Sequence, residues 1–316
     1  MPLVLNLAIS IFILMLSSVL LSESIEAFGS KLSLSHSFTG AIISPMFTSL
    51  PELVVLVTSI IILGRISGSE IAAGTIIGEP FMVSSLGFAA MAISYLIGKN
   101  GLRARDIDPI IPRTFLIMAG TFPIMLIPAL FGGMLLRVFV IVLLIILYIL
   151  IVRYFTRHRR NSQNNGNQEG RKFKSTIIIL ISGIILLLIG SVLIVNSIND
   201  ISILYHLNAE ITALFLVPIG TIIPETMVAV IWAYKGKINL AIGALIGEEF
   251  LFTTIYPIIG ILFTKWVVYW QGSLAVVLTS IFSILAGLSL IGKNRRILAL
   301  LFSFFTLIIF IILIVY

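Results

Sequence analysis

PMFTSLPE at residues 45–52 recurs as PIGTIIPE at residues 218–225, with Pro, Thr, Pro and Glu at matching positions. Later in each half, GTIIGE at residues 74–79 matches GALIGE at residues 243–248. The first pair is offset by 173 residues and the second by 169, so the stretch between the motifs is four residues shorter in the second half, about one helical turn. Two such matches in the same order indicate that the chain contains an internal duplication.

The composition indicates a membrane protein. Of 316 residues, 59% are hydrophobic and 10% are charged, and the mean hydropathy is +1.19, whereas soluble domains carry roughly 25% charged residues. A water-soluble enzyme is therefore excluded. Apolar runs of about 18 residues or more recur along the chain, each long enough to cross the bilayer as a helix, and both faces of each run are apolar, unlike the strands of a membrane β-barrel. With no cysteine, disulfides and thiolate sites are also excluded.

The apolar runs predict an all-α, polytopic fold with ten transmembrane helices. The expected helices are 3–24, 38–63, 71–98, 113–131, 135–153, 175–197, 207–234, 238–263, 272–291 and 297–315. They form a first five-helix repeat at 1–155 and a second at 175–316, joined by a flexible, basic cytoplasmic linker at 156–174. Because five is odd, the second repeat starts on the opposite side of the membrane and is inverted. Inverted repeats with Pro- or Gly-interrupted helices indicate a secondary transporter with a midplane site.

The basic residues predict the orientation in the membrane. If the N-terminus is outside, seventeen Lys and Arg residues face the cytoplasm and three face outward, as the positive-inside rule requires. Both termini are then extracellular, in a multi-pass protein of the cell membrane. The net charge of +7 is explained by this orientation, so we expect contact with membrane lipid and no nucleic-acid partner.

Four carboxylates lie inside otherwise apolar helices, at equivalent places of the two repeats: Glu52, Glu79, Glu225 and Glu248. A charge alone at membrane depth costs several kcal/mol, and these four segments contain no Lys or Arg. We therefore expect transported cations to supply the missing positive charge. Glu249 is a further candidate ligand, although it points about 100° away from its neighbour on a helix.

Each Pro-Glu motif also offers neutral oxygen ligands. The proline before each glutamate donates no backbone hydrogen bond and frees the carbonyl four residues back, at Phe47 and Gly220. Thr48 and Thr221 lie four residues before the glutamates, on the same helical face. Carboxylate, carbonyl and hydroxyl oxygens suit Ca²⁺ or Na⁺ better than soft transition metals.

With these two motifs, the chain resembles the cation/Ca²⁺ exchanger superfamily, particularly the sodium/calcium exchangers, whose repeats carry G-T-S-x-P-E and G-x-x-x-G-S-N. The resemblance covers both repeats. It implies that Thr48, Ser49 and Glu52, with Thr221 and Glu225, lie in the central ion site. It also implies that the helices at 3–24 and 175–197 slide against the rest to alternate access.

The chain departs from the family pattern at six positions. Phe47 replaces the first Gly, Ile222 replaces a Ser, Glu79 and Glu248 replace Ser after the second Gly, and Val83 and Phe252 stand where Asn or Asp is usual. Hydroxyl and amide ligands for Na⁺ are thus lost and two carboxylates are gained, which favours protons as a counter-ion beside Na⁺.

These patterns predict a secondary-active divalent cation antiporter, not an enzyme, that exchanges Ca²⁺ for H⁺ or Na⁺. Mg²⁺ and Mn²⁺ stay open as cargo, because oxygen ligands alone do not select among hard cations. No bound cofactor and no obligate protein partner are expected. A cation channel with a carboxylate selectivity site is the first alternative, and a membrane-embedded, metal-dependent lipid enzyme is the second.

Overall fold

The computed structural model describes residues 2–98, 107–157, 173–205, 214–215, 217–291 and 297–315. Helices make up this described part, without a strand, as the all-α prediction expects. The helices are α1 (Pro2–Lys31), α2 (His36–Phe38), η1 (Thr39–Ile43), α3 (Ser44–Thr48), α4 (Leu50–Met82), η2 (Val83–Gly87), α5 (Phe88–Ile97), α6 (Ile110–Thr121), η3 (Phe122–Leu126), α7 (Ile127–Phe131), α8 (Met134–Arg157), α9 (Phe173–Leu204), α11 (Val217–Tyr234), α12 (Ile238–Thr253), α13 (Ile255–Phe263), α14 (Trp270–Leu290), α15 (Leu298–Leu301) and α16 (Ser303–Val315). η1 and η2 are π-helical, and η3 is a 3₁₀-helix.

Seven helical segments in the described residues are long and apolar enough to cross a membrane. They are Leu5–Lys31, Ala72–Ile97, Ile110–Phe131, Met134–Arg157, Lys174–Leu193, Ile238–Phe263 and Trp270–Leu290. Large apolar side chains cover their outward faces, among them Leu135 on α8, which is 89% exposed. In a bilayer such side chains contact lipid. These seven agree with seven of the ten expected helices, and the full count of ten stays a prediction.

The other three expected helices are interrupted, incompletely described or short. The segment expected at 38–63 is divided into α2, η1, α3 and the start of α4, because Pro45 and Pro51 interrupt the backbone hydrogen bonds. Most of the first part of the helix expected at 207–234 lies outside the described residues. The last expected helix consists of α15 and the 13-residue α16. The linker expected at 156–174 also lies mostly outside the described residues, so the repeat boundaries remain predictions.

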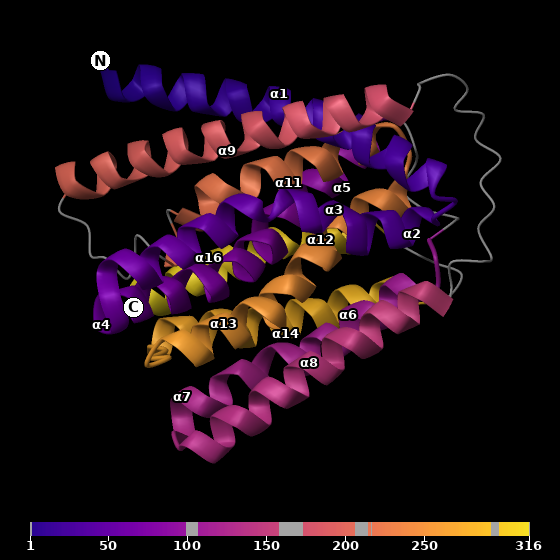
Figure 1. Cartoon of the computed structure of the whole chain (residues 1–316). Helices are drawn as coiled ribbons and strands as arrows, with labels where there is room; N and C mark the ends of the chain where they lie inside the picture. The colour runs from indigo at the N-terminus through magenta and orange to yellow at the C-terminus, as the bar shows by residue number, and fades with distance from the viewer. Residues whose placement is uncertain are drawn as a thin grey trace.

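α4 cannot be straight, although it is helical over its whole length. Glu52 and Glu79 are 27 positions apart in the sequence, which would separate them by about 40 Å along a straight helix. Instead they lie close enough to interact electrostatically. The chain therefore reverses its direction within α4, as its two antiparallel arms show (Figure 1). We expected a non-helical connection at 64–70, but the backbone there is helical. The expected change of direction between the two flanking segments is present.

α1 packs along α9 at one edge of the molecule, and α8 lies at the opposite edge (Figure 1). Glycines on α9 permit this close contact: a Cβ atom at Gly190 would lie 2.8 Å from the side chain of Leu14, and one at Gly183 would lie 3.1 Å from Leu21. The Ser17 hydroxyl donates a hydrogen bond to the Gly183 carbonyl over 2.9 Å. The helices expected at 3–24 and 175–197 thus lie side by side.

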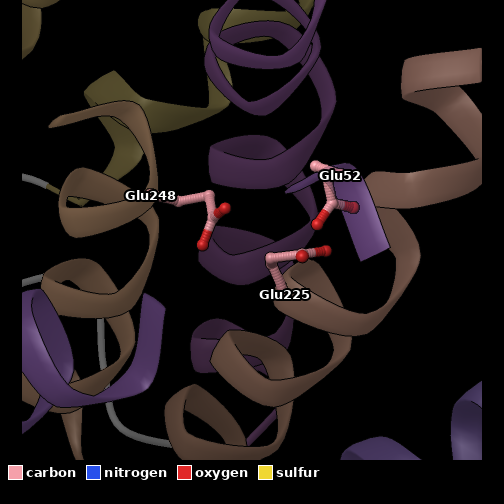
Figure 2. Close-up of side chains that lie close together, drawn as sticks. All are labelled: Glu52, Glu225 and Glu248. Atoms are coloured by element: carbon pink, nitrogen blue, oxygen red, sulfur yellow. The ribbon is translucent and has the colours of Figure 1, made fainter. Parts of the chain in front are cut away.

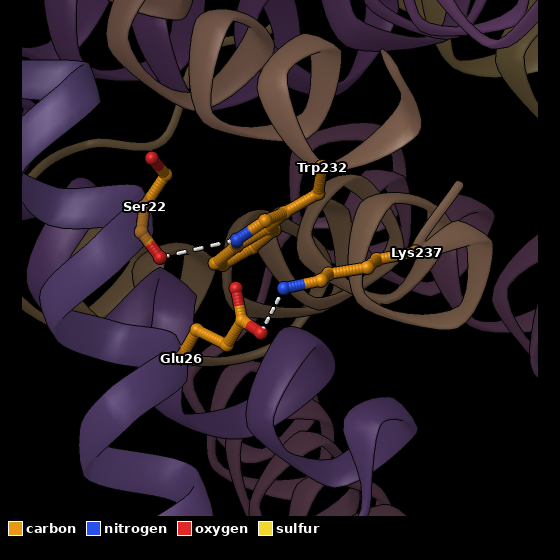
Figure 3. Close-up of polar contacts among 4 residues, drawn as sticks. All are labelled: Ser22, Glu26, Trp232 and Lys237. Atoms are coloured by element: carbon orange, nitrogen blue, oxygen red, sulfur yellow. Dashed lines mark hydrogen bonds and ion pairs between the residues drawn. The ribbon is translucent and has the colours of Figure 1, made fainter. Parts of the chain in front are cut away.

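The second half of α1 is also joined to the end of α11 and to the start of α12 (Figure 3). The indole N–H of Trp232 donates a hydrogen bond to the Ser22 carbonyl over 3.1 Å. Glu26 forms an ion pair with Lys237, which precedes α12. The Glu26 side chain is only 10% exposed, so at this buried acid the chain supplies its own positive charge.

Candidate metal centre

Three glutamates from three helices converge in the interior. Glu52 on α4, Glu225 on α11 and Glu248 on α12 are each at most 1% exposed. One carboxylate oxygen of each lies within 4.8 Å of the others, and the three side chains point toward one another (Figure 2). Three acids from distant parts of the sequence thus form one centre with the geometry of a cation site.

Glycines bring the helices that carry these acids close together. A Cβ atom at Gly247 would lie 2.1 Å from the carbonyl oxygen of Ala41 in η1, so a side chain there would prevent α12 from crossing η1 at this distance. Gly78 on α4 has the same relation to the carbonyl oxygen of Leu214, at 2.3 Å. Each of these glycines directly precedes a glutamate, and each close crossing places that glutamate against the opposite half of the chain.

The two motif threonines contact carboxylates of the opposite half. The Thr48 hydroxyl donates to Glu248 over 3.3 Å, and the Thr221 hydroxyl donates to Glu79 over 2.9 Å. Each hydroxyl also lies near a backbone carbonyl of its own helix, Ser44 for Thr48 and Pro218 for Thr221. Because a hydroxyl has one proton, it cannot donate fully to both acceptors, and its oxygen keeps lone pairs for a cation.

Most of the carboxylate oxygens have no hydrogen-bond partner. Among the described residues, this holds for both oxygens of Glu52 and of Glu225, and for one oxygen each of Glu79 and Glu248. Buried polar atoms are normally hydrogen-bonded, so a group of unpartnered acidic oxygens is unusual in a protein interior. A bound cation would supply both the missing ligand contacts and the missing charge.

The remaining expected ligands lie at different places around the centre. Ser49 is buried between α3 and α4, and its hydroxyl donates to the Pro45 carbonyl over 2.6 Å. Gly220 is buried on α11, and the ring of Phe47 packs edge-on against Phe28, with ring centroids 6.4 Å apart. The carbonyls of Phe47 and Gly220 receive no hydrogen bond from the prolines four residues on, so they stay candidate ligands.

Glu79 and Glu249 lie outside the group of three. Glu79 is fully buried and held by Thr221, as described above. Glu249 is also fully buried, and it accepts a hydrogen bond from Ser84 in η2. The sequence equates Glu79 with Glu248. In the structure the oxygens of Glu248 lie within 4.8 Å of those of Glu52 and Glu225, whereas Glu79 is outside this group but near enough to all three acids to interact with them electrostatically.

Sequence analysis missed Tyr256. This residue is 4% exposed, and its hydroxyl donates to the Ser49 carbonyl over 2.7 Å. It lies close enough to Glu52, Glu248 and Glu225 to interact with them electrostatically. The sequence carried no clear signal for it, because α12 ends at Thr253 and Tyr256 lies beyond the break, on α13.

The sequence profile of the sodium/calcium exchanger protein family matches residues 2–157 and 175–316, nearly the whole chain. The chain belongs to this family. The resemblance found in the two motifs is thereby confirmed. Membership makes the protein a cation exchanger of the membrane rather than an enzyme, so the lipid-enzyme alternative is rejected. No curated protein sequence matches the chain.

Solved structures of the sodium-calcium exchanger NCX_Mj have the same fold. The structure soaked with 2.5 mM Na⁺ and 0.1 mM Sr²⁺ matches with a TM-score of 0.75 and 19% identity, covering 98% of this chain and 99% of that one. The structure with 10 mM Na⁺ and zero Ca²⁺ matches with a TM-score of 0.76 and 19% identity, covering 98% of each chain. The structure with zero Na⁺ and Ca²⁺ matches with a TM-score of 0.72 and 19% identity, covering 99% of this chain and 98% of that one. Members of the family thus have the same fold at low sequence identity.

Proposed function

We propose that this exchanger is a secondary-active antiporter that moves a divalent cation, with Ca²⁺ preferred, in exchange for H⁺ or Na⁺ by alternating access. The observation that carries the proposal is the centre itself. Three buried carboxylates have oxygens within 4.8 Å of one another, and no basic side chain of the described residues pairs with them. Such a site is tolerable only when protons or a cation neutralise it.

The all-oxygen ligand set of the buried centre favours Ca²⁺ as cargo. Ca²⁺ binds carboxylate, carbonyl and hydroxyl oxygens at about 2.3–2.6 Å. The three carboxylates, whose oxygens lie within 4.8 Å of one another, are close enough together to bind one such ion. Mg²⁺ binds at about 2.0–2.1 Å and keeps several waters, for which the buried centre is less suited. The structures of the related NCX_Mj were obtained with Na⁺, Sr²⁺ or Ca²⁺, which agrees with a cargo of this kind.

Glu52, Glu225 and Glu248 are the principal ligands in this proposal, and the hydroxyls of Thr48 and Thr221 add neutral oxygens. The freed carbonyls behind the two prolines complete the shell. Glu79 contributes negative charge from beside the centre and holds Thr221. The roles expected from the sequence for Ser49 and Glu249 stay predictions.

The contacts around the centre support two inverted repeats in a ten-helix protein. Thr48 and Thr221 are equivalent at the 173-residue offset, and Glu248 and Glu79 are equivalent at the 169-residue offset. Their two hydrogen bonds are therefore the same contact made twice, once from each half. The glycine crossings repeat this relation, because Ala41 and Leu214 also differ by 173 residues. A pseudo-twofold axis through the centre explains such reciprocal pairs.

The charge of the centre requires a positively charged counter-ion. Four ionised glutamates would carry about −4 and one Ca²⁺ returns +2, so further positive charge has to accompany the acids in a medium of low dielectric constant. Protons or Na⁺ supply it, and their entry from one side displaces Ca²⁺ to the other. The excess of basic residues in the expected cytoplasmic connections supports extracellular termini and a location in the cell membrane.

Calcium efflux from proteoliposomes tests the proposal. Sodium and proton gradients are imposed separately, with Mg²⁺ and Mn²⁺ as competitors. An antiporter releases Ca²⁺ only when one of these gradients is present, and the effective gradient identifies the counter-ion. Efflux that proceeds without any counter-ion gradient would support the channel alternative instead.

A further inference from the structure

Beside the metal centre, the chain breaks between α12 and α13. α12 ends at Thr253 and α13 begins at Ile255, with Thr254 at φ −127° and ψ −70° between them. Pro257 explains the break, because it cannot donate to the Thr253 carbonyl and its ring clashes with that carbonyl. The break consists of the single residue Thr254, and Tyr256 lies in the first turn of α13.

Tyr256 connects the element that carries Glu52 to the element that carries Glu248. Its hydroxyl donates to the carbonyl of Ser49, the junction between α3 and α4, over 2.7 Å. Its ring stacks on Phe252 near the end of α12, with centroids 4.2 Å apart and the ring planes within 4° of parallel. Phe252 and Tyr256 are 1% and 4% exposed, so both contacts are made without competition from water.

We propose that Tyr256 is a positioning residue that fixes the distance between Glu52 and Glu248 and thereby selects the size of the cation. This inference rests on the proposed function. The role assigned to Tyr256 is positioning, because its two contacts are to the Ser49 carbonyl and to the Phe252 ring. It acts through the two carboxylates that its contacts keep in place.

The hydroxyl contact acts on Glu52 through the start of α4. Ser49 has φ −86° and ψ 12°, outside the helical values of its neighbours, and its own hydroxyl is turned back to Pro45. Its carbonyl accepts the amide of Leu53 over a long 3.2 Å, and Tyr256 is the second donor. Glu52 lies within this turn, so a shift of the Ser49 carbonyl moves the carboxylate.

The ring contact acts on Glu248 through the last turns of α12. Phe252 follows Glu248 by one helical turn, on the same face. Parallel stacking at this distance holds the Phe252 ring against Tyr256, and an aromatic pair contributes beyond its buried area.

A fixed oxygen spacing is what separates Ca²⁺ from Mg²⁺, since the two ions differ in metal-oxygen distance by about 0.3–0.5 Å. If the two acids drift apart or together, Ca²⁺ loses its fit, whereas Mg²⁺, which binds through its own waters, is affected less. Tyr256→Phe removes the hydroxyl and keeps the ring. The loss of one buried hydrogen bond should lower the ratio of Ca²⁺ to Mg²⁺ affinity about threefold to tenfold.

The experiment is titration calorimetry of the purified, full-length protein in detergent with Ca²⁺ and with Mg²⁺. Tyr148→Phe is the matched control, because it removes the same atom from a tyrosine on α8 and should leave the affinity ratio unchanged. Phe252→Leu should lower the ratio in the same direction as Tyr256→Phe, since it removes the stacked ring and keeps an apolar side chain.

The inference is overturned if Tyr256→Phe leaves the ratio at the wild-type value, including the case in which both affinities fall equally, because a merely structural role would do that. A failure of the proposed function looks different. In that case the wild-type protein binds neither cation, and the inference falls with the function it rests on.

Discussion

Buried glutamates occur in two regions of this protein, under opposite electrostatic conditions. At the second half of α1, Glu26 is paired with Lys237 (Figure 3). At the centre, Glu52, Glu225 and Glu248 lie together with unpartnered oxygens (Figure 2). Where a buried acid joins two structural elements, as Glu26 joins α1 to the start of α12, a lysine neutralises it. Among the residues that the structure describes, no basic side chain pairs with the three acids of the centre, which suits a site whose positive charge is the transported ion.

The largest expected effect comes from neutralising one acid of the centre. Glu225→Gln keeps the shape of the side chain and removes a charged ligand, so Ca²⁺ affinity should fall by about 100-fold or more, as for a broken buried ion pair. Without Ca²⁺, the variant should be at least as thermostable as the wild type, because one uncompensated buried charge has been removed. Calorimetry and thermal unfolding in detergent measure the two quantities. Unchanged Ca²⁺ binding would remove Glu225 from the site.

The next largest effect separates two acids that the sequence makes equivalent. Glu248 belongs to the group of three and Glu79 does not, so Glu248→Gln should cost at least about tenfold more Ca²⁺ affinity than Glu79→Gln, a difference of about 1.4 kcal/mol. The two variants are matched controls for each other, with the same chemical change at equivalent positions. Equal losses would show that the two halves contribute symmetrically to the centre.

The ion pair at α1 should affect stability rather than transport. Lys237→Met leaves Glu26 without its partner, and because the lysine is 28% exposed solvent screens part of the loss, so we expect about 1–2 kcal/mol of destabilisation. Ca²⁺ affinity should change less than about twofold. Lys235→Met, at an exposed neighbouring position, is the control. A loss of Ca²⁺ binding in Lys237→Met at full stability would contradict the contrast between the two regions.

The smallest effect is a pH dependence at His36, beside this ion pair. Burial lowers the pKa of His36 below its ordinary value of 6.5, the Glu26 carboxylate raises it, and Lys237 lowers it. Because the unfolded state binds the proton more readily, stability should fall as the pH drops below about 6.5, by at most about 1.4 kcal/mol per pH unit. Thermal unfolding across this range, compared with His36→Gln, measures the contribution. A slope that the substitution leaves unchanged would assign it to other groups.

The family could be predicted from the sequence, because a duplicated Pro-Glu motif in an apolar chain places acids where only cations or protons can neutralise them. The motif correctly indicated that Glu52 and Glu225 lie close together. It could not separate Glu79 from Glu248, since the two occupy equivalent positions of the repeated motif. Tyr256 was also missed, because its role depends on a helix break that places a phenol against a carbonyl 207 positions away.

Helix boundaries in the first half of the chain were predicted only approximately. Pro45, Pro51 and the π-helical segments divide the second expected helix, and the hydropathy pattern does not register such breaks because the residues on both sides are apolar. The sharp reversal inside α4 was expected as a connection at 64–70, but its backbone is helical.

The most direct test of the central claim is an anomalous-difference map from crystals of the wild-type protein grown with Ca²⁺. The account predicts one strong peak bounded by Glu52, Glu225 and Glu248, with carboxylate oxygens about 2.3–2.6 Å from it. A map with no peak among these three acids, from protein that binds Ca²⁺ in solution, would contradict it.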